Sequence, residues 1–155
     1  MPVRTGEQNL AGLRDRPREV HHRGQKVDDV TTFPGLANGA RSIASLYDMQ
    51  HDPKLRGDMT YTSPTTGDPV GLSFIAPRNL EDLQRRRIMM SHWAHTSYGM
   101  MGRTPDFLNV SIMAMAEAGD YFAQSRPEFK QNIINYYEYI RENDLTLTHT
   151  LVNLQ

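Results

Sequence analysis

Apolar side chains recur at the three- and four-residue spacing of an amphipathic helix in four long segments of this chain. We expect these helices to begin at Pro34, Asn79, Thr104 and Ser125, with proline- and glycine-containing turns between them. With 155 residues, the chain is long enough to bury a core of one domain. The sequence therefore predicts a mainly helical domain.

Shorter elements are predicted between and before these helices. Thr5-x-x-Gln8 is a capping-box pattern that opens a short helix. Val20–Val27 is typical of a hairpin that turns at Arg23-Gly24, and Met59–Ser63 with Val70–Ile75 is typical of a second strand pair.

The helical pattern changes toward the end of the chain. Gly119-Asp120 interrupts the third helix, and we interpret Asp120 as a turn residue and Tyr121 as core packing. Leu145–Val152 alternates apolar and polar residues, which is the period of a strand. We expect a helical domain over residues 1–143 and the start of a β-domain at residues 144–155.

The inward faces of the helices follow from the same spacing. The third helix should present Leu108, Ile112 and Met115 on one face. The side chains expected to pack inward from the fourth helix are Phe129, Ile133, Tyr136, Tyr137 and Ile140.

The apolar content is low for a self-sufficient domain. Apolar residues make up 38% of the chain and the mean hydropathy is -0.60. We therefore expect some apolar faces to pack against neighbours, and the nine methionines fit such adaptable surfaces. Ordinary helix core is the alternative reading of the methionines, because methionine is a good helix former.

The charge pattern excludes several classes of partner. With 17 basic and 18 acidic residues and a net charge of -1, the chain gives no electrostatic reason to bind nucleic acid or an anionic membrane. We expect the one basic run, Arg85–Arg87, to form a solvated or interface face. No apolar run approaches the roughly 20 residues that span a bilayer, and the first residues lack the apolar segment of a signal peptide. The absence of cysteine excludes disulfides and fits a cytoplasmic protein.

Two histidine pairs are candidate metal ligands. His21 and His22 are adjacent on a predicted strand and should point to opposite faces. His92 and His95 share one helix face, but no acidic residue lies four positions away. Surface or interface histidines are the better interpretation, and we expect no metal site.

Arg103 lies between a glycine-broken loop and the start of the third helix. Gly99 and Gly102 permit backbone angles that other residues avoid. Thr104 suits the cap of this helix, and Pro105 suits its first position. Asp106 suits the positive end of the helix dipole. A cation placed in this way can hold an anionic oxygen, although a surface or capping arginine is the plain alternative.

His149 is the second candidate for chemistry. On the strand reading it lies in line with Leu145, Leu147 and Leu151, which is typical of a core histidine. An imidazole that titrates near neutrality can also accept a proton, and a guanidinium stabilises a phenolate. Arg103 and His149 together form a candidate anion-binding and proton-handling site.

Five segments, in order, carry a resemblance to a known family. They are Arg4–Gly6, Val30–Pro34, Ser45–Asp48, Gly99–Asn109 and Thr148–Asn153. Together they resemble the 4-hydroxyphenylacetate 3-monooxygenase family, the flavin-dependent oxygenase component that hydroxylates phenols. Members are several times longer, so the chain resembles their N-terminal helical domain, which belongs to an acyl-CoA dehydrogenase-like flavoprotein, and the first strand of the following β-domain.

The resemblance implies a reaction and its partners. Such an enzyme would hydroxylate a phenol such as 4-hydroxyphenylacetate next to its hydroxyl, using O2 and reduced FAD from a separate flavin reductase. The full-length form would be a homo-oligomer, tetramer or dimer, and this fragment alone would be inactive. One alternative is a flavoprotein like 4-hydroxybutyryl-CoA dehydratase, although its iron–sulfur cluster needs cysteine ligands that this segment lacks. The other is a truncated, non-catalytic remnant.

The resemblance also implies roles for individual residues. Arg103 and His149 would be catalytic. The substrate-binding residues would be Arg103, Thr104, Pro105, Asp106, Phe107 and His149. The residues lining FAD would be His149, Thr150, Leu151, Val152 and Gln155.

Two positions depart from the family pattern. Family enzymes that act on 4-hydroxyphenylacetate commonly carry tyrosine where this chain has Phe107, which removes a hydrogen bond worth about 0.5–1.5 kcal/mol. Leu154 replaces the usual proline before Gln155, which loosens a turn beside the flavin.

Overall fold

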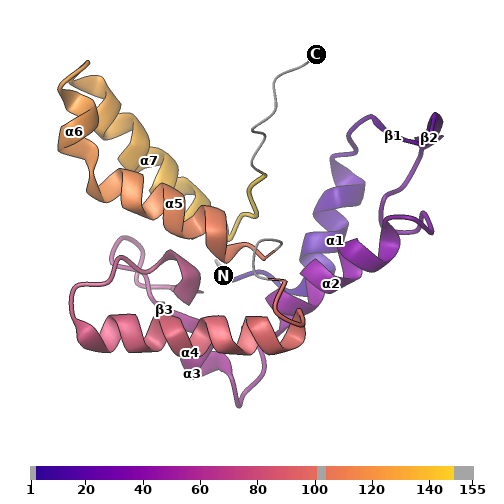
Figure 1. Cartoon of the computed structure of the whole chain (residues 1–155), viewed down its shortest axis with the longest axis horizontal. Helices are drawn as coiled ribbons and strands as arrows, with labels where there is room; N and C mark the ends of the chain where they lie inside the picture. Colours follow the sequence, from indigo (N-terminus) through magenta and orange to yellow (C-terminus); the bar gives the residue numbers. More distant parts are fainter. Residues whose placement is uncertain (1–2, 101–103, 149–155) are drawn as a thin grey trace. The chain divides into compact units, whose positions relative to one another are not determined.

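The computed structural model describes residues 3–100 and 104–148 (Figure 1). The described chain divides into two compact units, one formed by residues 4–56 and the other by residue 3 and the described residues from 57 onward. The elements of the first unit are α1 (Gly6–Asp15), β1 (Val20–His22), β2 (Gln25–Val27) and α2 (Ala37–Asp48). Those that follow are α3 (Arg56–Met59), β3 (Thr60–Thr62), β4 (Pro69–Gly71), the 3-10 helix η1 (Leu72–Phe74), α4 (Leu80–Thr96), α5 (Asp106–Glu117), α6 (Gly119–Ala123) and α7 (Glu128–Glu142). The prediction of a mainly helical fold is confirmed.

In the first unit, α1 packs against α2 at a glycine. The predicted capping box is confirmed, because Thr5 Oγ1 accepts from Gln8 N at 3.1 Å and Thr5 N donates to Gln8 Oε1 at 2.9 Å. Gly6 N donates to Asp48 Oδ1 at 2.7 Å. A Cβ on Gly6 would lie 2.5 Å from the Ala44 carbonyl oxygen, so only glycine permits this crossing.

The first hairpin is also confirmed. β1 pairs with β2 in antiparallel register, Val20 opposite Val27. Arg23 and Gly24 have positive φ angles of 52° and 78°, as a tight two-residue turn requires.

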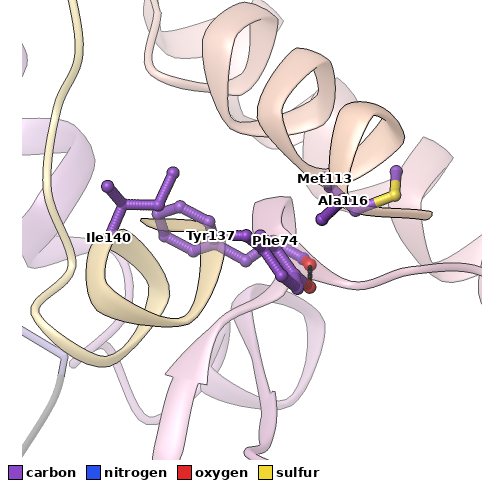
Figure 2. Close-up of a cluster of buried hydrophobic side chains, with 5 residues drawn as sticks. All are labelled: Phe74, Met113, Ala116, Tyr137 and Ile140. Atoms are coloured by element: carbon purple, nitrogen blue, oxygen red, sulfur yellow. Dashed lines mark hydrogen bonds between the residues drawn. The ribbon is translucent and has the colours of Figure 1, made fainter. Parts of the chain in front are cut away.

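In the second unit, the β3–β4 hairpin is confirmed but is shorter than predicted. Tyr61 pairs with Val70, and the chain leaves β4 directly into η1. One buried core cluster is formed by η1, α5 and α7, where Phe74, Met113, Ala116, Tyr137 and Ile140 pack together (Figure 2). Figure 1 shows α6 following α5, with α7 running beside both. The break between α5 and α6 lies at Ala118, one residue before the predicted Gly119-Asp120.

The helix starts agree with the sequence-based predictions only in part. Asn79 Oδ1 accepts from Asp82 N at 2.9 Å and caps α4 as predicted. The cap predicted at Ser125 is wrong, because α7 begins at Glu128, directly after Pro127. α5 begins at Asp106, directly after Pro105, whose helical φ and ψ angles of -61° and -25° fit the predicted first helical position. The cap predicted at Thr104 stays a prediction. α2 begins at Ala37 rather than Pro34.

Some predicted inward faces are wrong. Met115 is 43% exposed, and the side chains that α5 buries are Asp106, Asn109, Met113 and Ala116. Tyr121 is 70% exposed rather than packed in the core. On α7, Tyr137 and Ile140 are buried as expected, whereas two other predicted core residues, Phe129 and Tyr136, are exposed.

The basic run on α4 also differs from expectation. Arg87 is exposed, but Arg86 is only 6% exposed, so the prediction of a solvated or interface face is wrong for Arg86. Arg86 shares its helix face with the buried Met89 and Trp93.

The last described residues follow α7. Residues 145–148 form no strand, and the rest of the predicted strand Leu145–Val152 lies outside the described residues. The boundary predicted after residue 143 stays a prediction. None of the described helices is both long enough and apolar enough to span a bilayer.

Candidate functional site

The site predicted from sequence centres on the first residues of α5. Thr104, Pro105 and Asp106 are buried, and Phe107 is 52% exposed. Arg103 directly precedes Thr104 in the chain but lies outside the described residues.

A buried ion pair fixes the start of α5. Arg86 Nη2 donates to Asp106 Oδ1 at 2.7 Å, and Arg86 Nη1 donates to the Ser73 carbonyl oxygen at 2.7 Å. Both side chains of the pair are at most 8% exposed. Burial raises the pKa of Asp106 above its ordinary value, and the neighbouring Arg86 opposes this shift only in part. The Asp106 carboxylate, predicted to bind substrate, is thus oriented toward Arg86.

A second contact joins α5 to η1. Asn109 Nδ2 donates to Ser73 Oγ at 2.8 Å. Asn109 is 2% exposed, and its Oδ1 atom has no hydrogen-bond partner among the described residues. Ser73 therefore holds α4 through its carbonyl and α5 through its hydroxyl.

The end of α7 is held by a similar set of polar contacts. Glu142 accepts from Ser63 Oγ at 2.6 Å and from Thr66 Oγ1 at 2.8 Å. Arg141 donates to Glu142 Oε1 at 2.7 Å and to Thr65 Oγ1 at 2.6 Å. Burial alone would raise the pKa of Glu142, but its hydrogen bonds from Ser63, Arg141 and Thr66 together lower that pKa below the ordinary value.

Two tyrosines extend this contact toward the core. The Tyr137 hydroxyl donates to the Phe74 carbonyl oxygen (Figure 2). The Arg141 guanidinium lies 4.9 Å from the centre of the Tyr137 ring. Burial, and then the neighbouring Tyr137, raises the pKa of Tyr61 well above its ordinary value, which keeps the Tyr61 hydroxyl neutral.

The remaining predicted site residues fall in the last segment of the chain. His149, Thr150, Leu151, Val152 and Gln155 lie outside the described residues, so their roles stay predictions. The sequence reasoning missed Arg86 as part of the site's support. Its spacing from Met89 and Trp93 on one helix face was the signal that placed it inward.

The candidate metal-ligating histidines have other partners. His92 Nε2 lies 2.9 Å from Asp58 Oδ2, and His95 Nδ1 lies 2.7 Å from the Ser91 carbonyl oxygen. His21 Nε2 lies 3.0 Å from Glu19 Oε1. Across residues 3–100 and 104–148, no group of three potential ligand side chains is arranged to hold a metal ion.

Comparison with known proteins decides the family. Residues 5–155 match the family described as 4-hydroxyphenylacetate 3-hydroxylase N terminal. The chain belongs to this family. It is 47% identical over its full length to the 4-hydroxyphenylacetate 3-monooxygenase oxygenase component of a Geobacillus species, and 44% identical to that of Thermus thermophilus over 99% of its length. The chain spans 31% of each of these relatives.

Solved structures give the same family and fold. An oxygenase component of 4-hydroxyphenylacetate 3-monooxygenase has a TM-score of 0.89 at 44% identity, over 98% of this chain and 31% of that one. Another, complexed with FAD and 4-hydroxyphenylacetate, has a TM-score of 0.84 at 43% identity, over 97% of this chain and 31% of that one. An archaeal 4-hydroxybutyryl-CoA dehydratase shares the fold, with a TM-score of 0.78 at 14% identity over 93% of this chain and 28% of that one. The predictions of family and of fold class are confirmed.

Proposed function

We propose that this chain is the N-terminal part of an oxygenase that hydroxylates a phenol, such as 4-hydroxyphenylacetate, next to its hydroxyl. The observation that carries the proposal is the 43% identity over 97% of the chain to a structure that holds both FAD and 4-hydroxyphenylacetate. Identity to the dehydratase is only 14%, so the monooxygenase reaction is favoured over the dehydration.

The reaction balances with reduced flavin and O2. One oxygen atom is inserted at the ring carbon beside the hydroxyl, and that carbon loses its proton. The other oxygen atom leaves as water, and reduced FAD supplies the two electrons. Bound FAD supplies the reduced, oxygen-reactive ring, and the protein must bind the phenol and control its proton.

Arg103 and His149 would perform these two tasks. A phenol attacks an electrophilic oxygen faster as its hydroxyl loses a proton, so His149 accepts that proton from the phenol oxygen. Arg103 stabilises the negative charge that develops on the same oxygen. Thr104, Pro105 and Phe107 would shape the pocket, and Arg86 holds the Asp106 side chain at the start of α5.

The last segment carries donors that suit a flavin. The isoalloxazine ring presents carbonyl oxygens and ring nitrogens along one edge. His149, Thr150 and Gln155 offer side-chain donors for such an edge, and Leu151 and Val152 offer backbone N–H groups. These residues would hold FAD.

The partners follow from the same proposal. The oxygenase components among the relatives imply a separate flavin reductase that delivers reduced FAD. We infer a homo-oligomer, dimer or tetramer, for the complete protein. A cytoplasmic location fits the absence of cysteine.

The test uses the longest natural polypeptide that contains this chain, with a flavin reductase and 4-hydroxyphenylacetate. We expect oxygen-dependent formation of the ortho-dihydroxy product. Arg103→Ala should divert most oxygen to hydrogen peroxide, while Arg87→Ala, at an exposed position on α4, should not. No product from the wild-type protein, or full coupling in Arg103→Ala, would overturn the proposal.

A further inference from the structure

We propose that residues 63–74, from the β3–β4 turn through η1, form an anchor shared by the two halves of the site. This inference rests on the proposed function and concerns how Arg103 and His149 are positioned. The anchor segment contacts the first turn of α5 on one side and the last turn of α7 on the other.

On the α5 side, one residue of the anchor segment makes both contacts. The Ser73 carbonyl accepts from Arg86, which pairs with Asp106 at the first position of α5. The Ser73 hydroxyl accepts from Asn109, one turn further along α5. Both ends of the first turn of α5 are therefore tied to the same residue, and Arg103 lies only three positions before Asp106.

On the α7 side, the contacts come from both ends of the anchor segment. Ser63 and Thr66 donate to Glu142, and Phe74 accepts from Tyr137. Beyond α7, Leu145 N donates to the Ile140 carbonyl at 3.0 Å.

The chain after α7 is held against the core as far as Leu147. Leu145 and Leu147 pack against the core cluster that contains Phe74. His149 follows Leu147 by two residues. These contacts therefore lie three positions after Arg103 and two positions before His149 in the sequence.

The polar character of these contacts gives a reason to assign a positioning role. A hydrogen bond requires a particular distance and direction between its two groups, whereas apolar contacts between two elements are non-directional. Buried polar groups are costly unless satisfied, so they specify one arrangement of the elements that they join. Here they specify where the first turn of α5 and the end of α7 lie relative to residues 63–74.

The experiment removes hydrogen bonds on each side of the anchor and changes no residue that is proposed to bind the substrate. Ser73→Ala/Asn109→Leu removes both partners of one hydrogen bond, a change that is often nearly neutral for stability. Tyr137→Phe removes the hydroxyl bonded to Phe74. The matched controls on the exposed surface of α7 are Asn135→Leu and Tyr139→Phe.

Two readouts are needed in the longest natural polypeptide that contains the chain. Amide hydrogen exchange should accelerate at least tenfold in residues 104–109 for the double variant and in residues 143–148 for Tyr137→Phe. The dissociation constant for 4-hydroxyphenylacetate, with reduced FAD bound, should rise at least fivefold in both. Both controls should leave the two readouts unchanged.

The outcomes separate the anchor from the function. Unchanged exchange in both segments would overturn the anchor, whether or not the phenol binds. Faster exchange with unchanged phenol affinity would show a purely structural network and would also overturn the positioning role. If the wild-type protein binds no phenol, the proposed function fails, and the exchange results alone decide whether the segment holds α5 and α7.

Discussion

Glu142 illustrates how local contacts decide the behaviour of one residue. Its side chain is 16% exposed, and it accepts hydrogen bonds from Ser63, Thr66 and Arg141. Hydrogen bonds to a carboxylate favour the ionised form, so the pKa of Glu142 in the folded chain is below its unfolded value. Ionised Glu142 therefore stabilises the fold above the unfolded pKa, and this contribution is lost as the pH falls through the lower folded pKa.

We expect Glu142→Gln to reduce the free energy of unfolding by about 1–3 kcal/mol at pH 7, because hydrogen bonds to a charged group are lost. The difference from wild type should shrink as the pH falls below about 4.3, the ordinary pKa of glutamate. Urea unfolding from pH 7 to pH 3, followed by fluorescence of the single tryptophan Trp93, measures it. The exposed Glu128→Gln is the control, and a difference that stays constant over this pH range would contradict the pKa shift.

The Arg86–Asp106 pair gives a second prediction at the residue scale. Arg86→Met should destabilise the fold by about 3–5 kcal/mol, because it leaves a buried aspartate without its partner. Arg86→Met/Asp106→Leu should recover most of this loss, since no buried charge remains. Trp93 fluorescence in urea measures both. A double variant as unstable as Arg86→Met would show that the single variant does not act through an unpaired carboxylate.

Single residues were predictable where their partners are near in sequence. Thr5 with Gln8 and Asn79 with Asp82 were predicted correctly because each cap lies three residues from the group that it binds. Arg86 was misassigned because its charged partner, Asp106, is 20 residues away in the sequence. The spacing of Arg86 from Met89 and Trp93 on α4 indicates burial but not this partner.

At the scale of elements, the crossing of α1 and α2 depends on one glycine. A Cβ on Gly6 would meet Ala44 O at 2.5 Å and Asp48 Oδ2 at 2.6 Å, and the backbone atom cannot move aside easily. The approach also permits the hydrogen bond from Gly6 N to Asp48.

We expect Gly6→Ala to destabilise the α1–α2 pair by about 1–3 kcal/mol, as overpacking does. Gly12→Ala lies on the same helix, where the nearest atom to a Cβ is 3.9 Å away, and should stabilise it by about 0.5–1 kcal/mol. Amide exchange over residues 6–15 and 37–48 reports the local stability. Equal exchange in the two variants would contradict the proposed steric conflict.

The elements themselves were largely predictable, but their inward faces were predictable only in part. Periodicity located all four long helices and both hairpins, since these patterns are local. On α5 the face is shifted because Asp106 and Asn109 take inward positions for polar partners on α4 and η1. The spacing of apolar residues carries no information about such partners.

At the scale of the whole molecule, the family was predictable from five motifs that occur in the same order as in its members. The proposed function rests on this family membership. Arg103 and His149 come from segments 46 positions apart in the sequence, so local patterns alone do not bring them together. The described contacts at Ser73 and Glu142 supply a physical reason why both segments start from defined places.

The most direct measurement is a double-mutant cycle on phenol binding. The dissociation constant for 4-hydroxyphenylacetate, with reduced FAD present, is measured for the wild type, Arg103→Ala, His149→Ala and the double variant. If both side chains bind the same phenol oxygen, their effects should be coupled by about 0.5–3 kcal/mol. Effects that simply add, or an Arg103→Ala variant that binds as tightly as the wild type, would contradict the account.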